Sequence, residues 1–428
     1  MQVDLVVTNI GQLVTCASPD GPKRGSAMSD VGIIANAAVA IKDGRFAGVG
    51  TAEELARGYQ SEQIIDAGGR VVSPGFVDPH THIVFAGDRL DEFELKIKGA
   101  DYLEILAGGG GIISTVRKTR EASFDELVRL GLERLDKMLA CGTTACEIKT
   151  GYGLDLETEI KMLEVIAALD QRHCVDIVPT FLAAHAVPPE FKDDVERYVD
   201  LICDEMMPAA WNWYEQSHFK SGNVPLYADV FCEKNAFDIE QSRRIFKRAR
   251  QLGFVLKAHV DEFTNLGGSE LMINLGATSI DHLDAISNEE ITLLSQSETI
   301  GIITPTVNFN FGSADFAPAR RLIDAGCSIA LSTDFNPGSA PSPSQPMAMA
   351  IACRYQKLLP SETLNAATIN AAYSIGSADR FGSIEVGKSA DLLMCDIADY
   401  RQLAYEFGGN LINRIFKAGR DVTAARGI

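Results

Sequence analysis

The chain has 428 residues and a formal net charge of -19. Nucleic-acid binding depends on clustered lysine and arginine, so this acidic balance argues against a nucleic-acid partner. No apolar run reaches the roughly 18 residues that a membrane span needs, and the start lacks the basic and apolar regions of a signal peptide, so we expect a cytoplasmic protein without a membrane partner.

The pattern of apolar residues predicts two structural parts. The first seventy residues alternate short apolar runs with turns such as Asp43-Gly44, which is typical of antiparallel strands. From about residue 71, apolar runs alternate with helical stretches, which indicates parallel strands with crossover helices. Short strands return after residue 382. We therefore predict an α/β protein: a (β/α)8 TIM-type barrel over 71–382, with a small β-sandwich formed by 1–70 and 383–428.

Eight apolar runs are the predicted barrel strands. They cover residues 71–80, 143–149, 175–183, 227–232, 254–259, 278–282, 300–304 and 328–334. Ser123 and Glu126 have the spacing of a capping box at a helix start, and residues 155–169 form another predicted helix. The stretch 184–226 shows no clear period and is predicted to be irregular.

Five of the seven histidines follow the ends of predicted strands, where the active sites of α/β barrels lie. They are His80, His82, His185, His259 and His282. His80 and His82 are two residues apart on a strand, so both side chains reach the same ion. One such pair is weak evidence, and a lone histidine at a strand end is more often a core residue. Five at the active face of one barrel indicate a metal site.

We predict one divalent ion, held by His80, His82, His259 and Asp334. This nitrogen and oxygen set suits Zn²⁺ or iron (Fe²⁺ or Fe³⁺) and is unattractive to Ca²⁺ or Mg²⁺. Such an ion lowers the pKa of water and polarises a carbonyl, so hydrolysis needs no covalent nucleophile. His282 and Glu262 are the candidates for proton transfer, and a solvated loop carboxylate is the alternative for Glu262. The spacing leaves open whether Glu262, or Asp334 with His282, is the principal base.

The run PGFVDPHTH, which ends at His82, resembles the first-strand signature of the amidohydrolase superfamily. Further runs are similar to those of the superfamily members that hydrolyse the cyclic amide of 4-imidazolone-5-propanoate to N-formimidoyl-L-glutamate in histidine degradation. These runs are HTHIVFAGDR, GGGGI, KTGYGLDLETE, AHAVP, FCEK and STDFNPGS, and together they span nearly the whole chain. KTGYGL and DFNPGS are much more specific than the His-x-His pair.

The resemblance implies the same four metal ligands and a set of substrate contacts. These contacts are Arg89, Tyr152, His185, Glu262, Asn336, Gly338 and Ser339. A propanoate tail calls for a guanidinium that forms a bidentate pair, and Arg89 closely follows the first strand. Without the resemblance, Arg89 would be interpreted as a surface ion-pair residue and Tyr152 as a turn residue.

The resemblance also implies a single ion, a small-molecule substrate with a carboxylate tail, and a homodimer. Many relatives hold two ions on a carbamylated lysine after the fourth strand, and Lys234 near that place is interpreted as structural. The glycines at 108–111 lack the lysine of a phosphate loop and are interpreted as a mobile flap, with an inert turn as the alternative. Rival functions are another cyclic-amide hydrolase, a nucleobase deaminase on the same scaffold, or a barrel that has lost catalysis.

Overall fold

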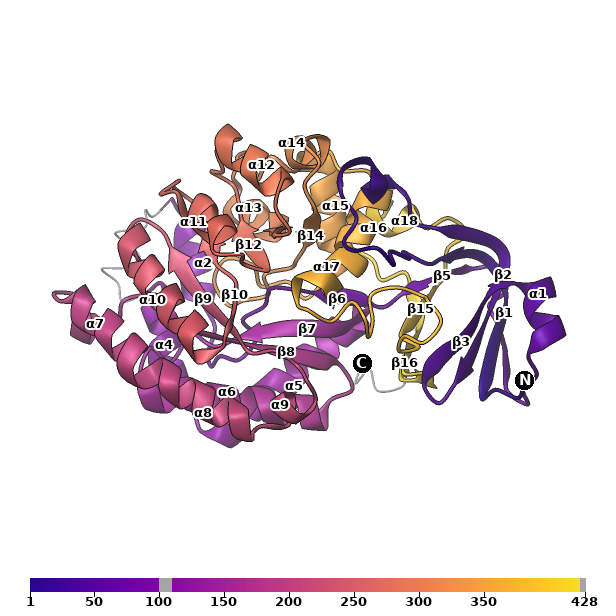
Figure 1. Cartoon of the computed structure of the whole chain (residues 1–428), viewed down its shortest axis with the longest axis horizontal. Coiled ribbons are helices and arrows are strands. Elements are labelled where there is room, and N and C mark those ends of the chain that lie inside the picture. Colours follow the sequence, from indigo (N-terminus) through magenta and orange to yellow (C-terminus); the bar gives the residue numbers. More distant parts are fainter. Residues whose placement is uncertain (100–109, 424–428) are drawn as a thin grey trace.

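The structure is a computed structural model that describes residues 1–99 and 110–423. A parallel barrel and a mixed sheet organise the chain (Figure 1). In Figure 1 the indigo and yellow segments from the two ends of the chain meet at the right, and the magenta to orange barrel lies to the left. The predicted fold class, a (β/α)8 barrel with a small β domain from both termini, is confirmed.

The barrel strands follow one another around the ring in chain order, and each pairs in parallel with its neighbour. They are β6 (Phe76–Asp78), β7 (Thr143–Lys149), β8 (Asp176–Ala184), β9 (Tyr227–Cys232), β10 (Val255–Leu256), β11 (His259–Val260), β12 (Ser279–His282), β13 (Ile300–Ile303) and β14 (Ile329–Leu331). A bridge between Thr81 and Phe335, with a 3.0 Å hydrogen bond from the His82 N–H to the Phe335 carbonyl, joins the last strand to the first. The two segments β10 and β11 together make the fifth strand.

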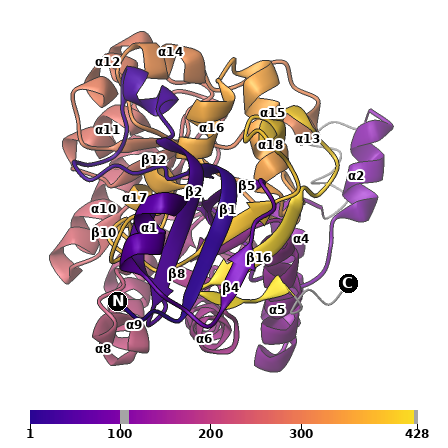
Figure 2. The same cartoon turned by 90° about the vertical axis from the view of Figure 1, so that its right-hand side faces the viewer.

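Helices surround the barrel, and all but the first of them, which projects outward in Figure 2, lie against the rest of the chain. They are α2 (Leu90–Ile97), α4 (Ile112–Glu121), α5 (Phe124–Ala140), α6 (Leu156–Arg172), α7 (Val195–Leu201), α8 (Met207–Gln216), α9 (His218–Ser221), α10 (Ile239–Leu252), α11 (Gly268–Asn274), α12 (Asn288–Ser295), α13 (Pro305–Phe311), α14 (Ala319–Asp324), α15 (Gln345–Tyr355), α16 (Pro360–Ala366), α17 (Ile369–Ser374) and α18 (Gln402–Tyr405). Ser123 caps α5 by accepting from the Glu126 N–H, which is one of the two hydrogen bonds of the predicted capping box. Among the helices of the described residues, none is long and apolar enough to cross a membrane.

The prediction of an irregular stretch over 184–226 was wrong. Most of it is helical, because α7 and α8 are joined through a π-helical turn at Ile202–Met206. The buried residues Tyr198, Ile202, Met206 and Ala210 recur every four residues, which is longer than the 3.6-residue turn of an α-helix. The wider π turn restores this register, and it also obscures the α-helical period in the sequence.

The strands from the two ends of the chain form one mixed sheet. Its members are β1 (Leu5–Val14), β2 (Ile33–Lys42), β3 (Arg45–Thr51), β4 (Ile64–Asp66), β5 (Val71–Pro74), β15 (Leu392–Cys395), β16 (Ile412–Lys417) and β17 (Arg420–Asp421). They are arranged in the order β17-β16-β15-β5-β1-β2-β3, with β4 beside β1, and α1 (Ala52–Gly58) packs on β2 and β3 (Figure 2).

The strand predicted at 71–80 is two strands in different sheets. β5 pairs with β1 and β15, whereas β6 pairs with β7 in the barrel. Gly75 lies between them, and a Cβ atom there would approach the Thr144 hydroxyl oxygen to 2.1 Å, so only glycine lets the chain cross at this point. The division into 1–70 with 383–428 and 71–382 stays a proposal, in which β5 is the strand that links the two parts.

Candidate metal and catalytic site

The predicted metal ligands converge at the carboxyl ends of the barrel strands. The Nε2 atoms of His80 and His82 are 3.2 Å apart, and those of His82 and His259 are 3.3 Å apart. Asp334 Oδ1 lies 3.6 Å from Nε2 of both His80 and His82. All four side chains are buried. The structure therefore brings together the three imidazoles and the carboxylate that the sequence singled out.

The chemistry of these four groups fits a divalent cation. Burial lowers the pKa of His80 and His82 well below the ordinary value, which keeps both imidazoles neutral and able to donate a lone pair. Burial also raises the pKa of Asp334 to about 8. The Asp334 Oδ1 atom is buried without a hydrogen-bond partner among the described residues. Opposed ring nitrogens and an unpartnered carboxylate oxygen are the arrangement that a shared ion satisfies.

His282 and Glu262 face each other beside this cluster. His282 Nε2 lies 3.8 Å from Glu262 Oε2, and its Nδ1 lies 3.1 Å from the Thr304 hydroxyl oxygen. Burial, assisted by the nearby charge of Asp334, raises the pKa of Glu262 well above the ordinary value. Burial lowers the pKa of His282 well below the ordinary value, so burial favours the uncharged form of both groups, a protonated carboxyl and a neutral imidazole.

The backbone carrying these groups is held in unusual conformations. Positive φ angles occur at Asp261 (54°), His282 (83°) and Asp334 (48°). Asp261 directly precedes Glu262, and the other two are themselves predicted site residues. Such strain persists where the surroundings fix it and is common at functional sites. For the Glu262 loop the fixing group is Glu233, whose Oε2 accepts from the N–H groups of Phe263 (2.9 Å) and Thr264 (3.1 Å).

Sequence reasoning did not find a role for Glu233. The only signal for it was the run FCEK, in which it follows β9 directly, at the same end of the barrel as the histidines.

Tyr152 and His185 line one side of the cluster. The His185 ring stacks on His82 with 4.9 Å between centroids, and its Nδ1 lies 3.1 Å from the Gly151 carbonyl oxygen. The Tyr152 ring centroid is 5.9 Å from that of His82 and 5.4 Å from that of His185. Both predicted substrate contacts therefore lie beside the candidate metal ligands.

Arg89 lies against the loop after β14. Its Nε donates to Glu92 at 2.7 Å and its Nη2 pairs with the other oxygen of the same carboxylate. Its Nη1 faces Gly338, where a Cβ atom would come within 2.0 Å. Burial alone would raise the pKa of Glu92, but hydrogen bonds from Arg89 and Lys96 lower it to about 2. Arg89 is thus held by Glu92 on one edge and faces the predicted substrate loop with the other.

Asn336 organises that loop. Its Oδ1 accepts from the N–H groups of Gly338 and Ser339, each at 2.8 Å, and its Nδ2 donates to the Asp334 carbonyl and the Ser339 hydroxyl, each at 2.7 Å. Both ends of the amide are therefore engaged within the loop, which ties the loop to the backbone of Asp334.

Further charged groups lie behind the histidines. His80 Nδ1 is 2.6 Å from Asp281 Oδ2, and His259 Nδ1 is 3.0 Å from Asp229 Oδ2. Lys149 contacts both carboxylates, at 2.7 Å for Asp229 and 3.6 Å for Asp281. Burial alone would lower the pKa of Lys149, but the carboxylates around it raise that pKa above the ordinary value. No sequence signal pointed to a role for Asp229 or Asp281, and Lys149 was only the first residue of the run KTGYGLDLETE.

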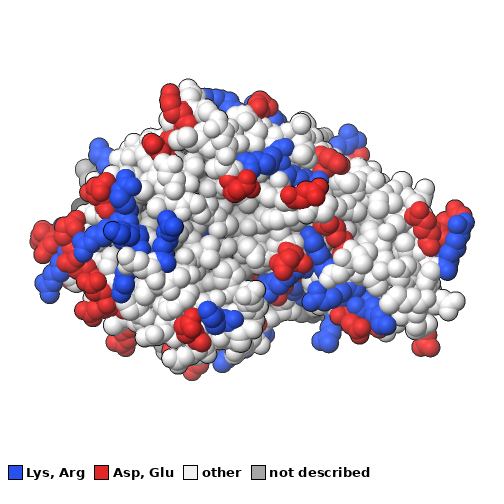
Figure 3. All heavy atoms as spheres, in the orientation of Figure 1, with Lys and Arg blue, Asp and Glu red and all other residues white. Residues whose placement is uncertain are grey.

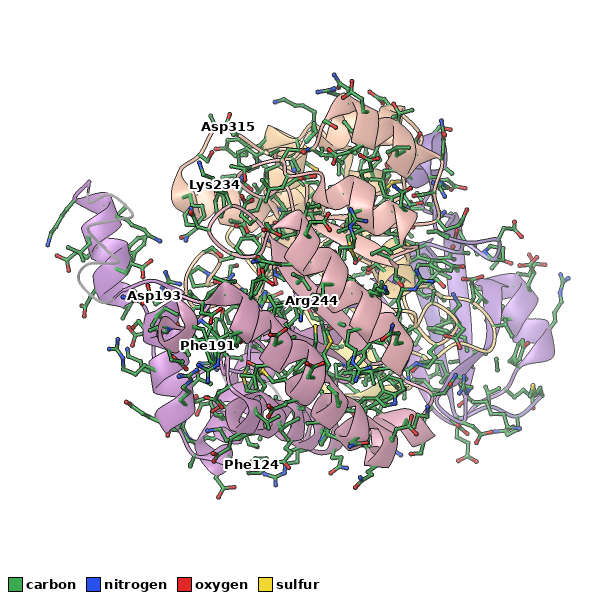
Figure 4. The ribbon with its side chains drawn as sticks, turned by 60° about the vertical axis from the view of Figure 1, so that its left-hand side comes forward. Phe124, Phe191, Asp193, Lys234, Arg244 and Asp315 are labelled. Carbon is green, nitrogen blue, oxygen red and sulfur yellow. The ribbon has the colours of Figure 1, made fainter. Side chains whose placement is uncertain are left out.

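Lys234 does not reach the site. Its side chain is exposed, and Figure 4 shows it among surface side chains, on the same side of the barrel as Asp315. Of the glycines interpreted as a flap, 108 and 109 lie outside the described residues. Figure 3 shows acidic and basic side chains interspersed on the face drawn there. Arg244 on α10 forms an ion pair with Asp200 on α7.

Comparisons with known proteins place this geometry in a family. Two models of the Amidohydrolase family match residues 237–426 and 63–103. The chain is 51% identical to a protein of Chloroflexus aggregans named Imidazolonepropionase, over 98% of both chains. It is 50% identical to the protein of the same name from Herpetosiphon aurantiacus and 43% identical to that from Bacillus velezensis, over 97% or more of each chain.

Solved structures share the fold at much lower identity. An adenosine deaminase from Xanthomonas campestris with bound zinc has a TM-score of 0.71 and 19% identity, and covers 99% of this chain and 94% of its own. A guanine deaminase from E. coli has a TM-score of 0.70 and 16% identity, with coverage of 97% and 98%. At these identities the likeness extends to the fold alone.

Proposed function

The chain belongs to the imidazolonepropionases of the amidohydrolase family and hydrolyses the carbon–nitrogen bond of a cyclic amide, and we propose how its residues carry out that reaction. The substrate is 4-imidazolone-5-propanoate and the product N-formimidoyl-L-glutamate, an intermediate of histidine degradation. The observation that carries the proposal is the convergence of His80, His82, His259 and Asp334 in a chain 51% identical to a named imidazolonepropionase over almost its full length.

In this proposal the four converging residues hold a single divalent ion, Zn²⁺ or iron. Three imidazoles and one carboxylate match the borderline-soft character of those ions. When bound, the ion supplies Lewis acidity, which lowers the pKa of water and polarises the amide carbonyl. The exposed position of Lys234 supports one ion over two.

His282, Glu262 and Asp334 move the protons of the reaction. Asp334 and His282 orient the attacking water and take its proton. His282 then donates a hydrogen bond to the oxyanion of the tetrahedral intermediate. Glu262 is the acid that delivers a proton to the ring nitrogen as it leaves. Its raised pKa supports this role, because burial favours the protonated carboxyl, which is a donor and not a base.

Arg89 binds the propanoate tail. The Nη1 edge of the guanidinium, which faces Gly338, forms charge-assisted hydrogen bonds with the carboxylate while Glu92 holds the other edge. Gly338 has no side chain, so the guanidinium can lie in van der Waals contact with the loop. On the remaining sides, the ring and the tail of the substrate are enclosed by Tyr152, His185 and the hydroxyl of Ser339.

Loss of the ultraviolet absorbance of imidazolone propanoate tests the whole proposal. The purified protein should consume this substrate, stop on addition of a chelator and resume when Zn²⁺ or Fe²⁺ is returned. Guanine, cytosine and dihydroorotate serve as competing substrates, and faster turnover of any of these would assign the site to a deaminase or to another ring hydrolase. In variants, turnover unchanged in Glu262→Gln but abolished in His282→Ala would refute the acid role of Glu262.

We also propose a cytoplasmic homodimer. Tyr355, Tyr405 and Phe407 carry exposed aromatic rings, with 51%, 74% and 65% of their surface accessible, and exposed apolar groups of this size are typical of protein contacts. Size-exclusion chromatography with light scattering measures the mass directly, and a monomer mass at micromolar concentration would reject the dimer.

A further inference from the structure

One layer of the barrel interior is charged where such barrels are usually filled with branched apolar side chains. It lies behind the candidate metal ligands and consists of Glu147, Lys149, Asp229, Lys257 and Asp281. The exposed fraction of each of these side chains is 0%. Burying so many ions is costly unless each is paired, so the layer calls for an explanation beyond packing.

Strand alternation places these groups together. Residues two apart on a strand share a face, so Glu147 and Lys149 both point into the barrel from β7, and Lys257 points the same way as His259. Lys257 comes two residues before His259 and Asp281 directly before His282, whereas Glu147, Lys149 and Asp229 come from the strands β7 and β9.

Lys149 joins the carboxylates that support two candidate ligands. Its Nζ donates to Asp229 Oδ2 at 2.7 Å, and that same oxygen lies 3.0 Å from Nδ1 of His259. Asp229 Oδ1 also accepts a hydrogen bond from the backbone N–H of His259 at 3.1 Å. Lys149 Nζ lies 3.6 Å from the Asp281 oxygen that contacts His80 Nδ1, and it donates to Glu147 at 3.0 Å.

Lys257 holds the main chain before His80. Its Nζ donates to the Pro79 carbonyl at 2.7 Å and to Glu147 Oε2 at 3.0 Å, and it lies 3.9 Å from Asp281. His80, Glu147 and Asp281 offer ligand atoms close enough together for a cation of their own. The two ammonium groups already lie within hydrogen-bond reach of Glu147, so the lysines take the place that such an ion would need.

We propose that Lys149 is a positioning residue for the metal site, acting through Asp229 on the ring of His259, and that Lys257 plays the corresponding part for the backbone of His80. A ligating histidine presents one ring nitrogen to the ion only if the other nitrogen is held, and the holding carboxylate must itself be fixed in place. Lys149 fixes it. The inference rests on the ion proposed at His80, His82, His259 and Asp334.

Lys149→Met tests the proposal on protein stripped of metal and reloaded. Competition with a chromophoric chelator gives the Zn²⁺ affinity, and the visible spectrum of the Co²⁺ form reports ligand geometry, so neither readout depends on turnover. We expect Zn²⁺ to bind about 10- to 100-fold more weakly than in the wild type, with an altered Co²⁺ spectrum. Asp229→Asn, which is nearly isosteric, should give the same pair of changes and replaces Lys149→Met if that variant does not fold.

Lys417→Met is the matched control. Lys417 is also a buried lysine between two carboxylates, Asp391 at 2.6 Å and Asp176, but it lies on β16 in the terminal sheet. Its loss should lower thermal stability and leave the Zn²⁺ affinity within about twofold, because distant sites act independently. Unchanged affinity and spectrum in Lys149→Met, or an equal loss of affinity in Lys417→Met, overturns the proposal.

The same experiment separates the inference from the proposed function. A wild-type protein that takes up no divalent ion would refute both the proposed metal site and the positioning role. A wild-type protein that binds Zn²⁺ but does not turn over imidazolone propanoate would reject the substrate assignment, while the comparison of Lys149→Met with Lys417→Met would still decide the positioning role.

Discussion

Replacing Gly338 by alanine should weaken binding of the propanoate tail without unfolding the protein. The added Cβ would lie 2.0 Å from Arg89 Nη1 and 2.7 Å from Cζ, well inside contact distance. The backbone of Gly338 accepts alanine, because its φ is not in the left-handed region. The atoms that must move belong to the end of the Arg89 side chain and not to the backbone, so the strain falls on the guanidinium and its pair with Glu92 and the fold is kept.

The size of the effect follows from the interaction that is lost. A hydrogen bond to a charged group contributes about 1.5–3 kcal/mol, and the displaced guanidinium would lose most of a bidentate pair. A loss of about 2–3 kcal/mol corresponds to roughly a 30- to 140-fold rise in KM. Because the carboxylate of the tail takes no part in the bond changes at the carbonyl, its binding is nearly uniform between ground and transition states, and kcat should change little.

Steady-state kinetics on imidazolone propanoate measure this directly. Arg89→Met should raise KM as much as Gly338→Ala does, and the double variant should be no worse than either, because both changes remove one interaction. An imidazolone that lacks the tail should be hydrolysed equally by the wild type and the variants. Gly58→Ala is the control, since no heavy atom lies within 4 Å of the added Cβ there.

A rise in KM of less than about threefold in Gly338→Ala, with Arg89→Met strongly impaired, would show that the guanidinium binds from another edge. Normal KM values in both variants would remove Arg89 from the site. A large loss of thermal stability in Gly338→Ala would contradict the argument that only a flexible side chain moves.

Three further outcomes follow from the site. Glu262→Gln should lower kcat by about 100-fold or more. Because Glu262 acts in its protonated form, the wild-type kcat should fall as the pH rises through the raised pKa of Glu262, and the pH profile of the variant should lack this fall. Glu233→Ala frees the N–H groups of Phe263 and Thr264, so kcat should drop about tenfold or more with KM nearly unchanged, and an unchanged kcat would deny it any positioning role. Chelation should lower the Tm as well as stop turnover, because an ion present at 100 times its Kd stabilises the folded state by about 2.7 kcal/mol. A Tm that does not change on addition of the chelator would argue against a bound ion.

The barrel and the convergence of the candidate ligands could be predicted from the sequence, because both follow from the order of the strands along the chain. Parallel strands end at the same face of the ring, so knowing that His80, His82, His259 and Asp334 follow strands was sufficient to predict that they meet. The distances of 3.2–3.6 Å between their ligand atoms agree with that prediction. Their roles as metal ligands, and those of the substrate contacts, stay predictions.

What the sequence could not provide depends on contacts between distant residues. Strand alternation puts Glu147 and Lys149 on one face, but β7 is buried on both faces, so the period does not say which face is the interior. The break at Gly75 arises from the approach of Thr144, which lies 69 residues away in the sequence. The helices over 195–221 were missed because a π turn interrupts their period.

The two parts of the site differ in how they are held, and this bears on specificity. The histidines and Asp334 lie at the ends of barrel strands, backed by a buried charged layer, whereas Arg89 and Gly338 lie on connecting segments held by Glu92 and Asn336. Deaminases with 16–19% identity share the barrel with TM-scores of 0.70–0.71, so the fold tolerates wide changes in sequence. In such folds the chemistry of different substrates is set by the connecting segments. A change of substrate should therefore begin at Arg89 and the loop after β14, and substitutions in the charged layer should weaken metal binding for any substrate.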